Sequence, residues 1–333
     1  FKDVALSMLP QLLTAAKKTK KMPGDITILT ATSGDTGKAA LAGFADVLDI
    51  SGYNYRERLY EEDHKRFPDR VIMGSENGHD VSAWNAVKDN DYICGQFLWT
   101  GIDFLGECTG WPKRISQAGM LDLCGYEKPL YYRRKALWTD VPFVKIAVSK
   151  GEKEKTNPWT DKFTYNFTDG EKIQVSCYTN EREVELFLND KTLGTLQTDE
   201  NCRVTWEIPF EKGTLRAVTA NANDTLSTSY EAESINFSVY EDDSDIVQVE
   251  VSLLDKNGSC ASSDEIIYYQ LAGDGRILGI ENGKPDDLTC YNEKYRSTYG
   301  GKAVVYVKKG NSTDFLTLHA YTKSGLYCER KIK

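Results

Sequence analysis

Beyond about residue 141 the chain consists of short runs in which apolar and polar residues alternate, separated by turn residues. Runs of this kind lie at 173–178, 184–188, 204–208, 247–254, 266–271, 302–307 and 315–321. A period of two residues predicts strands with one buried face, and many short strands at this spacing predict β-sandwiches. We therefore predict two immunoglobulin-like β-sandwich domains, at 141–230 and 231–333, with the polar stretch 221–233 linking them.

Before residue 141, helical and strand-like segments alternate. Strands are expected at 26–32, 48–53, 70–75 and 92–99, and helices at 3–22, 37–46 and 128–138. Parallel strands need such intervening segments, because a parallel neighbour is reached only by a long crossover. The chain is therefore predicted to be multidomain, with an α/β part followed by an all-β part.

The composition limits the partners that the protein can have. Of the 333 residues, 40% are hydrophobic and 27% are charged, as in ordinary globular proteins. The net charge of −9 disfavours nucleic acid and anionic membranes, which repel an acidic surface, whereas a neutral carbohydrate is compatible with it. No apolar run approaches the roughly 20 residues that cross a bilayer, so we expect no membrane partner.

The eight cysteines are scattered, with no CxxC pair and no histidine at metal-binding spacing. This pattern argues against a structural zinc site, and we predict no bound metal. We expect free thiols in a reducing, cytoplasmic compartment, although Cys177 and Cys202 could pair within the first sandwich.

One carboxylate, Glu76, ends an apolar strand with the sequence RVIMGSE over 70–76. That position corresponds to the C-terminal mouth of a parallel barrel, where catalytic groups of this architecture lie. A glutamate after a strand is more often simply solvated, so the surrounding segments decide its interpretation.

The surrounding segments follow the order of one enzyme family. They read LDISGYNY at 48–55, GQFLWTGIDF at 95–104, GECTGWP at 106–112 and GMLDLCGYEKPLYY at 119–132. With the strand that ends at Glu76, they resemble the sixth, seventh and eighth strands and the last helix of the catalytic barrel of glycoside hydrolase family 2, in its β-galactosidase-like members. The resemblance implies that 47–140 is the C-terminal part of a partial (β/α)8 (TIM) barrel containing its last three strands.

The resemblance continues into the all-β part. The sequence YTNEREVELFLN at 178–189 resembles the sandwich that follows the barrel, and GDGRILGIENG at 273–283 resembles a sandwich that some of these enzymes append.

The resemblance implies a retaining glycosidase that cleaves terminal β-D-galactosides through a glycosyl-enzyme intermediate. Glu76 matches the nucleophile, and Tyr55 matches a tyrosine whose hydroxyl donates a hydrogen bond to it. Trp99 matches the aromatic floor under the sugar, and Asn54 is a candidate contact to a sugar hydroxyl. Tyr55 and Trp99 could instead be packing aromatics, and Asp103 is equally a candidate for lining the cleft or for a structural role.

The general acid/base glutamate of the family follows an asparagine on the fourth barrel strand, upstream of the segment matched here. The pairs Asn180-Glu181 and Asn292-Glu293 lie in the sandwich domains, so neither fits. Loss of proton assistance to the leaving group costs a factor of about 10² to 10⁴. We therefore expect the chain to be inactive, or nearly so, on its own.

Residues 1–46 resemble a different family, threonine synthase, through FKDVAL at 1–6 and TATSGDTGKAALAGF at 30–44. The resemblance implies that Lys2 would form a Schiff base with pyridoxal phosphate, and that Ser33, Asp35 and Thr36 would lie at the cofactor ring and substrate. The phosphate loop and remaining cofactor walls of that family have no counterpart downstream. We expect no bound cofactor, since pyridoxal phosphate would bind only if that fragment were complete.

Three interpretations compete: a glycosidase fragment, a threonine synthase, and a non-catalytic β-sandwich protein that binds carbohydrate. A threonine synthase would need the residues beyond 46 to continue its fold, and they do not. The order and spacing of the motifs favour the glycosidase fragment. We then expect the four N-terminal strands to form one parallel sheet, too small to close a barrel, with Glu76, Tyr55 and Trp99 at one end of it.

Overall fold

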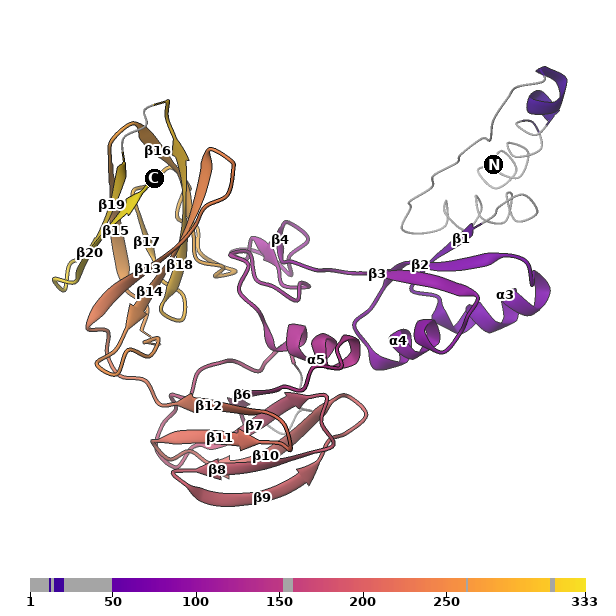
Figure 1. The fold of residues 1–333 in the computed structure, drawn as a ribbon, viewed down its shortest axis with the longest axis horizontal. Coiled ribbons are helices and arrows are strands. Elements are labelled where there is room, and N and C mark those ends of the chain that lie inside the picture. Colours follow the sequence, from indigo (N-terminus) through magenta and orange to yellow (C-terminus); the bar gives the residue numbers. More distant parts are fainter. Residues whose placement is uncertain (1–11, 13–14, 21–49, 152–157, 262, 312–314) are drawn as a thin grey trace. The chain divides into compact units, whose positions relative to one another are not determined.

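The computed structural model describes residues 12, 15–20, 50–151, 158–261, 263–311 and 315–333 (Figure 1). The chain divides into two compact units, residues 1–100 and 101–333. The predicted strand 26–32 and helix 37–46 lie outside the described residues, while Leu12 and residues 15–20 of the predicted first helix are helical. In the part of the chain that the structure describes, no helix has both the length and the apolar character needed to span a membrane.

The first unit contains a parallel three-stranded sheet, β1-β2-β3. Its strands are β1 (Ile50–Asn54), β2 (Val71–Asn77) and β3 (Ile93–Leu98). The first crossover contains η1 (Glu57–Leu59) and α3 (Tyr60–Arg66), and the second contains α4 (Val81–Lys88). The predictions of strands at 48–53, 70–75 and 92–99 are thus confirmed.

Both helices cover the same face of this sheet (Figure 1). Tyr60 of α3 and Val87 of α4 pack with Ile72 and Ile93 in one buried cluster. Side chains alternate between the faces of a strand, so the residues between these core positions point to the opposite face. There, the directly paired Ile50 and Val71 are 51% and 37% exposed.

The second unit begins with a short hairpin and a helix. The hairpin pairs β4 (Phe104–Leu105) with β5 (Ile115–Ser116), and the helix is α5 (Pro129–Trp138). A proline at the first helical position suits the start of a helix, because its missing N–H would have no intrahelical partner there. The predicted helix at 128–138 is confirmed.

The first all-β domain contains two antiparallel sheets, β10-β7-β6 and β12-β11-β8-β9. The three strands of the first are β6 (Val144–Lys150), β7 (Lys172–Thr179) and β10 (Arg203–Pro209). The four of the second are β8 (Glu183–Leu188), β9 (Lys191–Gln197), β11 (Thr214–Val218) and β12 (Asn223–Ser227). Ile146 and Val175 from one sheet share a core with Leu186 and Leu215 from the other.

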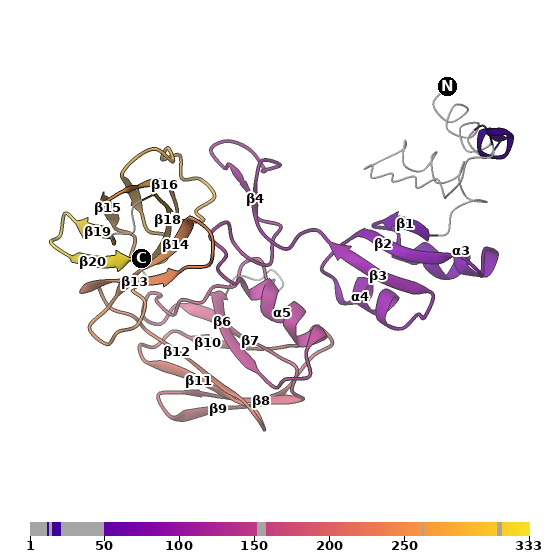
Figure 2. The same cartoon turned by 45° about the horizontal axis from the view of Figure 1, so that its top comes forward.

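The second all-β domain has the same plan, with sheets β13-β14-β18-β16 and β17-β15-β19-β20 (Figures 1 and 2). One comprises β13 (Ser234–Tyr240), β14 (Ile246–Leu254), β16 (Gly275–Glu281) and β18 (Lys302–Lys309). The other comprises β15 (Ile266–Ala272), β17 (Tyr295–Ser297), β19 (Leu316–Thr322) and β20 (Tyr327–Ile332). Val249 and Val305 from the first pack with Ile267 and Leu318 from the second, as in a sandwich-type domain.

Two details refine the sequence analysis. The stretch 221–233 is not a pure linker, because its residues Asn223–Ser227 form strand β12 and pair with β11. All eight cysteines are free, including Cys177 and Cys202.

Candidate active site

Four of the predicted site residues lie at the carboxyl ends of neighbouring parallel strands. Glu76 is near the end of β2 and pairs in register with Asn54, the last residue of β1. Tyr55 follows β1 directly, and Trp99 follows β3. The structure therefore brings Asn54, Tyr55, Glu76 and Trp99 to one edge of the sheet.

Glu76 is held by the end of the neighbouring strand. The Asn54 side-chain Nδ2 donates a hydrogen bond to Glu76 Oε2 at 3.2 Å, and the Tyr55 backbone N–H donates to the Glu76 carbonyl at 2.8 Å. Burial, the charge of Glu76 and a side-chain hydrogen bond with Glu76 together raise the pKa of Tyr55 to about 12. The Tyr55 hydroxyl therefore keeps its proton at neutral pH and acts as a donor to the carboxylate.

Asn77 fixes the backbone on either side of the site. Its side chain is fully buried and hydrogen-bonded to the Tyr60 hydroxyl, while its carbonyl accepts the Trp99 backbone N–H at 3.0 Å. A Cβ at Gly74 would lie 2.3 Å from Asn77 Oδ1, so only glycine leaves room for this side chain. Asn77 thus links the ends of β2 and β3, and the sequence analysis did not identify it.

Tyr55 and Trp99 are each partly exposed, at 40% and 39% of the residue surface. A buried packing aromatic would expose much less, so both rings are accessible to a ligand. An exposed aromatic face beside a carboxylate suits a sugar, which has C–H faces and a reacting anomeric carbon.

Asp103 lies in the second unit and is engaged with its own segment. Only 3% of it is exposed, and its Oδ1 accepts hydrogen bonds from the Gly119 backbone N–H and from Lys128 Nζ, both at 2.8 Å. Burial raises the pKa of Asp103 even though Lys128 and Gly119 favour the ionised form. These contacts give Asp103 a structural role in this segment, and a sugar contact by Asp103 stays a prediction.

The predicted cofactor residues Lys2, Ser33, Asp35 and Thr36 lie outside the described residues. Within the described ranges, no group of three or more His, Cys, Asp or Glu side chains is placed to hold a metal ion.

A second buried carboxylate, Glu281, organises a polar network that the sequence analysis did not identify. Arg114 Nη2 donates to both Glu281 oxygens at 2.8 and 3.0 Å, and the Tyr291 hydroxyl donates to Glu281 Oε2 at 2.5 Å. Arg296 Nη1 lies 3.4 Å from Glu281 Oε1 and from Asp287 Oδ2. Burial opposes ionisation, yet the bonds from Arg114 and Tyr291 outweigh it and hold the pKa of Glu281 below its usual range.

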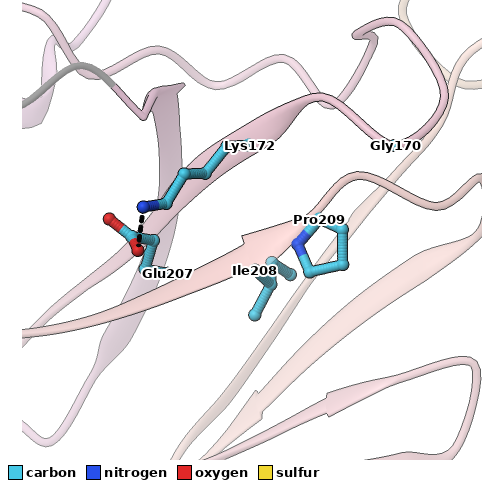
Figure 3. Close-up of a pocket in the computed structure, with 5 residues that line it drawn as sticks. All are labelled: Gly170, Lys172, Glu207, Ile208 and Pro209. Carbon is cyan, nitrogen blue, oxygen red and sulfur yellow. Dashed lines mark ion pairs between the residues drawn. The ribbon is translucent and has the colours of Figure 1, made fainter.

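A hollow of about 270 Å³ lies on the first all-β domain and shares no residue with the strand ends described above. It is lined by Gly170, Lys172, Glu207, Ile208 and Pro209 (Figure 3). Lys172 Nζ and Glu207 Oε1 pair with each other at 2.5 Å, and both side chains are largely exposed. Because these two charges already neutralise each other, the hollow offers a ligand little beyond a shallow apolar floor.

Two protein families match the all-β part of the chain. Residues 170–226 match a domain of unknown function, DUF4982, and residues 231–326 match the glycoside hydrolase family 2 C-terminal domain 5. The matched ranges follow one another and correspond to parts of the two all-β domains.

Individual relatives extend the similarity. The chain is 31% identical over 265 residues to "Beta-galactosidase BoGH2A" of Bacteroides ovatus, covering 75% of this chain and 29% of that protein. It is 30% identical over 246 residues to a "Putative beta-glucuronidase" of Formosa agariphila, covering 68% and 22%. A crystal structure of a glycosyl hydrolase family 2 member from Bacteroides cellulosilyticus is 28% identical, with a TM-score of 0.85, covering 99% of this chain and 47% of that one.

These matches support the interpretation of the chain as a fragment of a glycoside hydrolase family 2 protein. The chain spans less than a third of the length of the two curated relatives and about half of the solved one. Nothing in the comparisons supports the threonine synthase resemblance of residues 1–46.

Proposed function

We propose that residues 50–100 carry the nucleophile side of a retaining glycosidase site and that the complete protein hydrolyses terminal β-D-galactosides. The observation that carries this proposal is the convergence on Glu76 of the Asn54 amide and the Tyr55 hydroxyl at the carboxyl ends of parallel strands. A relative named as a β-galactosidase favours galactose, while relatives named as putative β-glucuronidases make glucuronate the alternative sugar.

The chemistry assigns one role to each side chain. Glu76 attacks the anomeric carbon, the bond to the leaving oxygen breaks, and a glycosyl ester with Glu76 forms and is later hydrolysed by water. Tyr55 donates its hydrogen bond to the carboxylate and holds it in the attacking position. Trp99 offers its exposed ring to the C–H face of the sugar, and the Asn54 amide holds Glu76 Oε2.

We also propose that β1, β2 and β3 are the last three strands of a (β/α)8 barrel and that the two all-β domains are immunoglobulin-like. The apolar face with Ile50 and Val71 exposed supports the barrel, because it is the face that further strands and their side chains would cover in a closed barrel. The shared cores of the paired sheets support the second part.

The general acid/base glutamate of the family has no match among these 333 residues. We therefore propose that the site in this chain lacks the proton donor to the leaving group. This chain should hydrolyse substrates whose leaving group needs a proton very slowly or not at all. The missing acid assistance should lower the rate by a factor of about 10² to 10⁴. Substrates with a leaving group that needs no proton should still react with Glu76.

The test uses 2-deoxy-2-fluoro-β-D-galactosyl fluoride, whose fluoride leaves without acid assistance and whose glycosyl ester is long-lived. We expect mass spectrometry to find one sugar attached to Glu76 and none attached in Glu76→Gln. Glu62→Gln, which changes an exposed carboxylate of α3, is the matched control and should label normally. The glucuronyl analogue tests the alternative sugar. Attachment to another carboxylate, or labelling that persists in Glu76→Gln, would refute the assignment.

A further inference from the structure

The chain contains three Asn-Gly pairs, at Asn77-Gly78, Asn257-Gly258 and Asn282-Gly283. An asparagine followed by glycine readily loses its side-chain amide, because glycine has no Cβ to obstruct the attack of its backbone nitrogen on the asparagine side chain. The three pairs share this chemistry, so the structure around each pair decides whether the reaction takes place there.

Two of the pairs are buried and their amides are engaged. Asn77 is 0% exposed, and its Nδ2 donates to the Tyr60 hydroxyl at 3.3 Å. Asn282 is 1% exposed, and its Nδ2 donates to Asp287 Oδ2 at 2.6 Å and to the Ser297 carbonyl at 2.8 Å. Side chains held in this way turn toward the following backbone nitrogen only when the surrounding structure opens.

The third pair lies in an exposed turn directly after β14. Asn257 and its neighbours Lys256 and Gly258 are all exposed. The Asn257 backbone N–H donates to Asp255 Oδ1 at 2.9 Å, whereas its side-chain amide has no hydrogen bond to any residue that the structure describes. The Gly258 N–H donates to the Asp255 carbonyl at 2.9 Å within the same turn, and exposed turns open locally at a small cost in free energy.

We propose that Asn257 is a site of spontaneous deamidation, a covalent modification for which water is the co-reactant. The Gly258 nitrogen forms a bond to Asn257 Cγ, and its proton passes through water to Nδ2. The Cγ–Nδ2 bond breaks and ammonia leaves, which gives a five-membered succinimide. Water then opens this ring: attack at Cγ leaves aspartate, and attack at the backbone carbonyl carbon of Asn257 leaves isoaspartate. No atom is oxidised or reduced.

The isoaspartate product changes the turn that holds the segment between the two all-β domains. Asp255 Oδ1 accepts the N–H groups of Asn257 and Ser259 at 2.9 and 3.0 Å. Its Oδ2 accepts the Tyr230 N–H at 3.0 Å, and Lys256 Nζ lies 4.0 Å from the centre of the Tyr230 ring. Isoaspartate adds one carbon to the backbone between the two N–H groups, so one oxygen no longer bridges them. The hold on Tyr230 weakens with the turn.

The experiment ages the folded chain in mildly alkaline buffer and follows the three asparagines by peptide mass spectrometry. Trypsin places them on separate peptides, 71–88, 257–276 and 277–294. An unaged sample corrects for amide lost during digestion. We expect Asn257 to lose its amide at least about tenfold faster than the two buried asparagines, which react only after local opening. In the urea-unfolded chain the three rates should become similar.

Gly258→Ala is the matched variant, because its Cβ meets no atom within 4 Å and yet obstructs closure of the ring. We expect the amide of Asn257 to be lost about tenfold more slowly in this variant. Asn257→Asp carries the new charge without the extra backbone carbon. Hydrogen exchange of residues 228–233 should become faster in the aged chain and stay unchanged in Asn257→Asp.

Amide loss in the folded chain at the same rate for Asn257 and Asn282 would overturn the proposal. So would a Gly258→Ala variant that loses the Asn257 amide as fast as the unchanged chain. Unaltered exchange of residues 228–233 in a chain shown to contain isoaspartate would refute the weakened hold on Tyr230.

Discussion

Two glutamates of this protein each receive a tyrosine hydrogen bond, yet their surroundings give them opposite properties. Glu281 is 4% exposed and lies against the guanidinium groups of Arg114 and Arg296. The partners that the structure describes for Glu76 are the neutral side chains of Asn54 and Tyr55. A carboxylate paired with buried cations holds a structure together, whereas one held by neutral donors has no cation beside it, as the role we propose for Glu76 requires.

The largest effect expected from this comparison is on stability. Glu281→Ala leaves the Arg114 guanidinium without its carboxylate and Arg296 with Asp287 as its remaining one, which should lower the free energy of unfolding of the second unit by about 3–5 kcal/mol. Glu76→Gln keeps the size and the acceptor and should cost less than about 1 kcal/mol. Urea unfolding followed by circular dichroism measures both free energies of unfolding. Equal losses of stability in the two variants would contradict the difference in role between Glu281 and Glu76.

A third carboxyl group, that of Asp122, should make the stability of the second unit depend on pH. Burial raises the pKa of Asp122 to about 6, against the opposing backbone hydrogen bonds from Tyr126 and Cys124. A raised carboxyl pKa means that the folded state holds its proton more tightly, so folding loses stability as pH rises from about 4 through about 6.

Asp122→Asn removes that penalty and keeps the Oδ1 acceptor for the Cys124 and Tyr126 N–H groups. We expect it to raise the free energy of unfolding by about 1–2 kcal/mol at pH 7. The gain should shrink toward zero at pH 4. Thermal unfolding across this pH range is the measurement, and a gain that does not depend on pH would contradict the assigned pKa.

The smallest effect concerns Tyr55. Tyr55→Phe removes the donor to Glu76 without changing the ring, and one hydrogen bond to a charged group corresponds to about 1.5 kcal/mol or roughly a tenfold change in rate. We expect the rate at which the fluorinated galactosyl fluoride labels Glu76 to fall by about that factor. Tyr53→Phe is the control, because Tyr53 donates to Asp63 at 2.5 Å rather than to Glu76. Equal rate changes in the two variants would show that the effect is not specific to Glu76.

Much of the fold follows from local sequence. The apolar runs of β2 and β3 and the alternating runs of β7, β8 and β14 predict strands because their period is visible within a few residues. Strand β12 was not predicted, because its sequence NDTLS contains a single large apolar residue and shows no clear alternation. Its pairing with β11 is what makes it a strand.

The polar residues likewise fall into those that local sequence identifies and those that it does not. Glu76 is identifiable because a carboxylate at the end of a parallel strand has a predictable place, and Tyr55 and Trp99 follow their own strands. Arg114 and Glu281 are separated by 167 residues in the sequence, and neither segment has a pattern that identifies its partner. Asp103 was predicted either to line the cleft or to have a structural role, and its bond to Lys128 could not be predicted because it depends on a loop that returns 25 residues later.

The exposed apolar face of the first unit has a practical consequence for handling the protein. Phe97 is 64% exposed, and Ile50 and Val71 add to the apolar surface of the β1-β2-β3 sheet. Such surfaces stick to one another in concentrated solution, and sheet edges favour the same outcome. We expect the chain to precipitate on concentration and to bind fluorescent apolar dyes, while residues 101–333 expressed by themselves remain dissolved. Crystallisation and calorimetry will therefore proceed more easily on the second unit than on the whole chain.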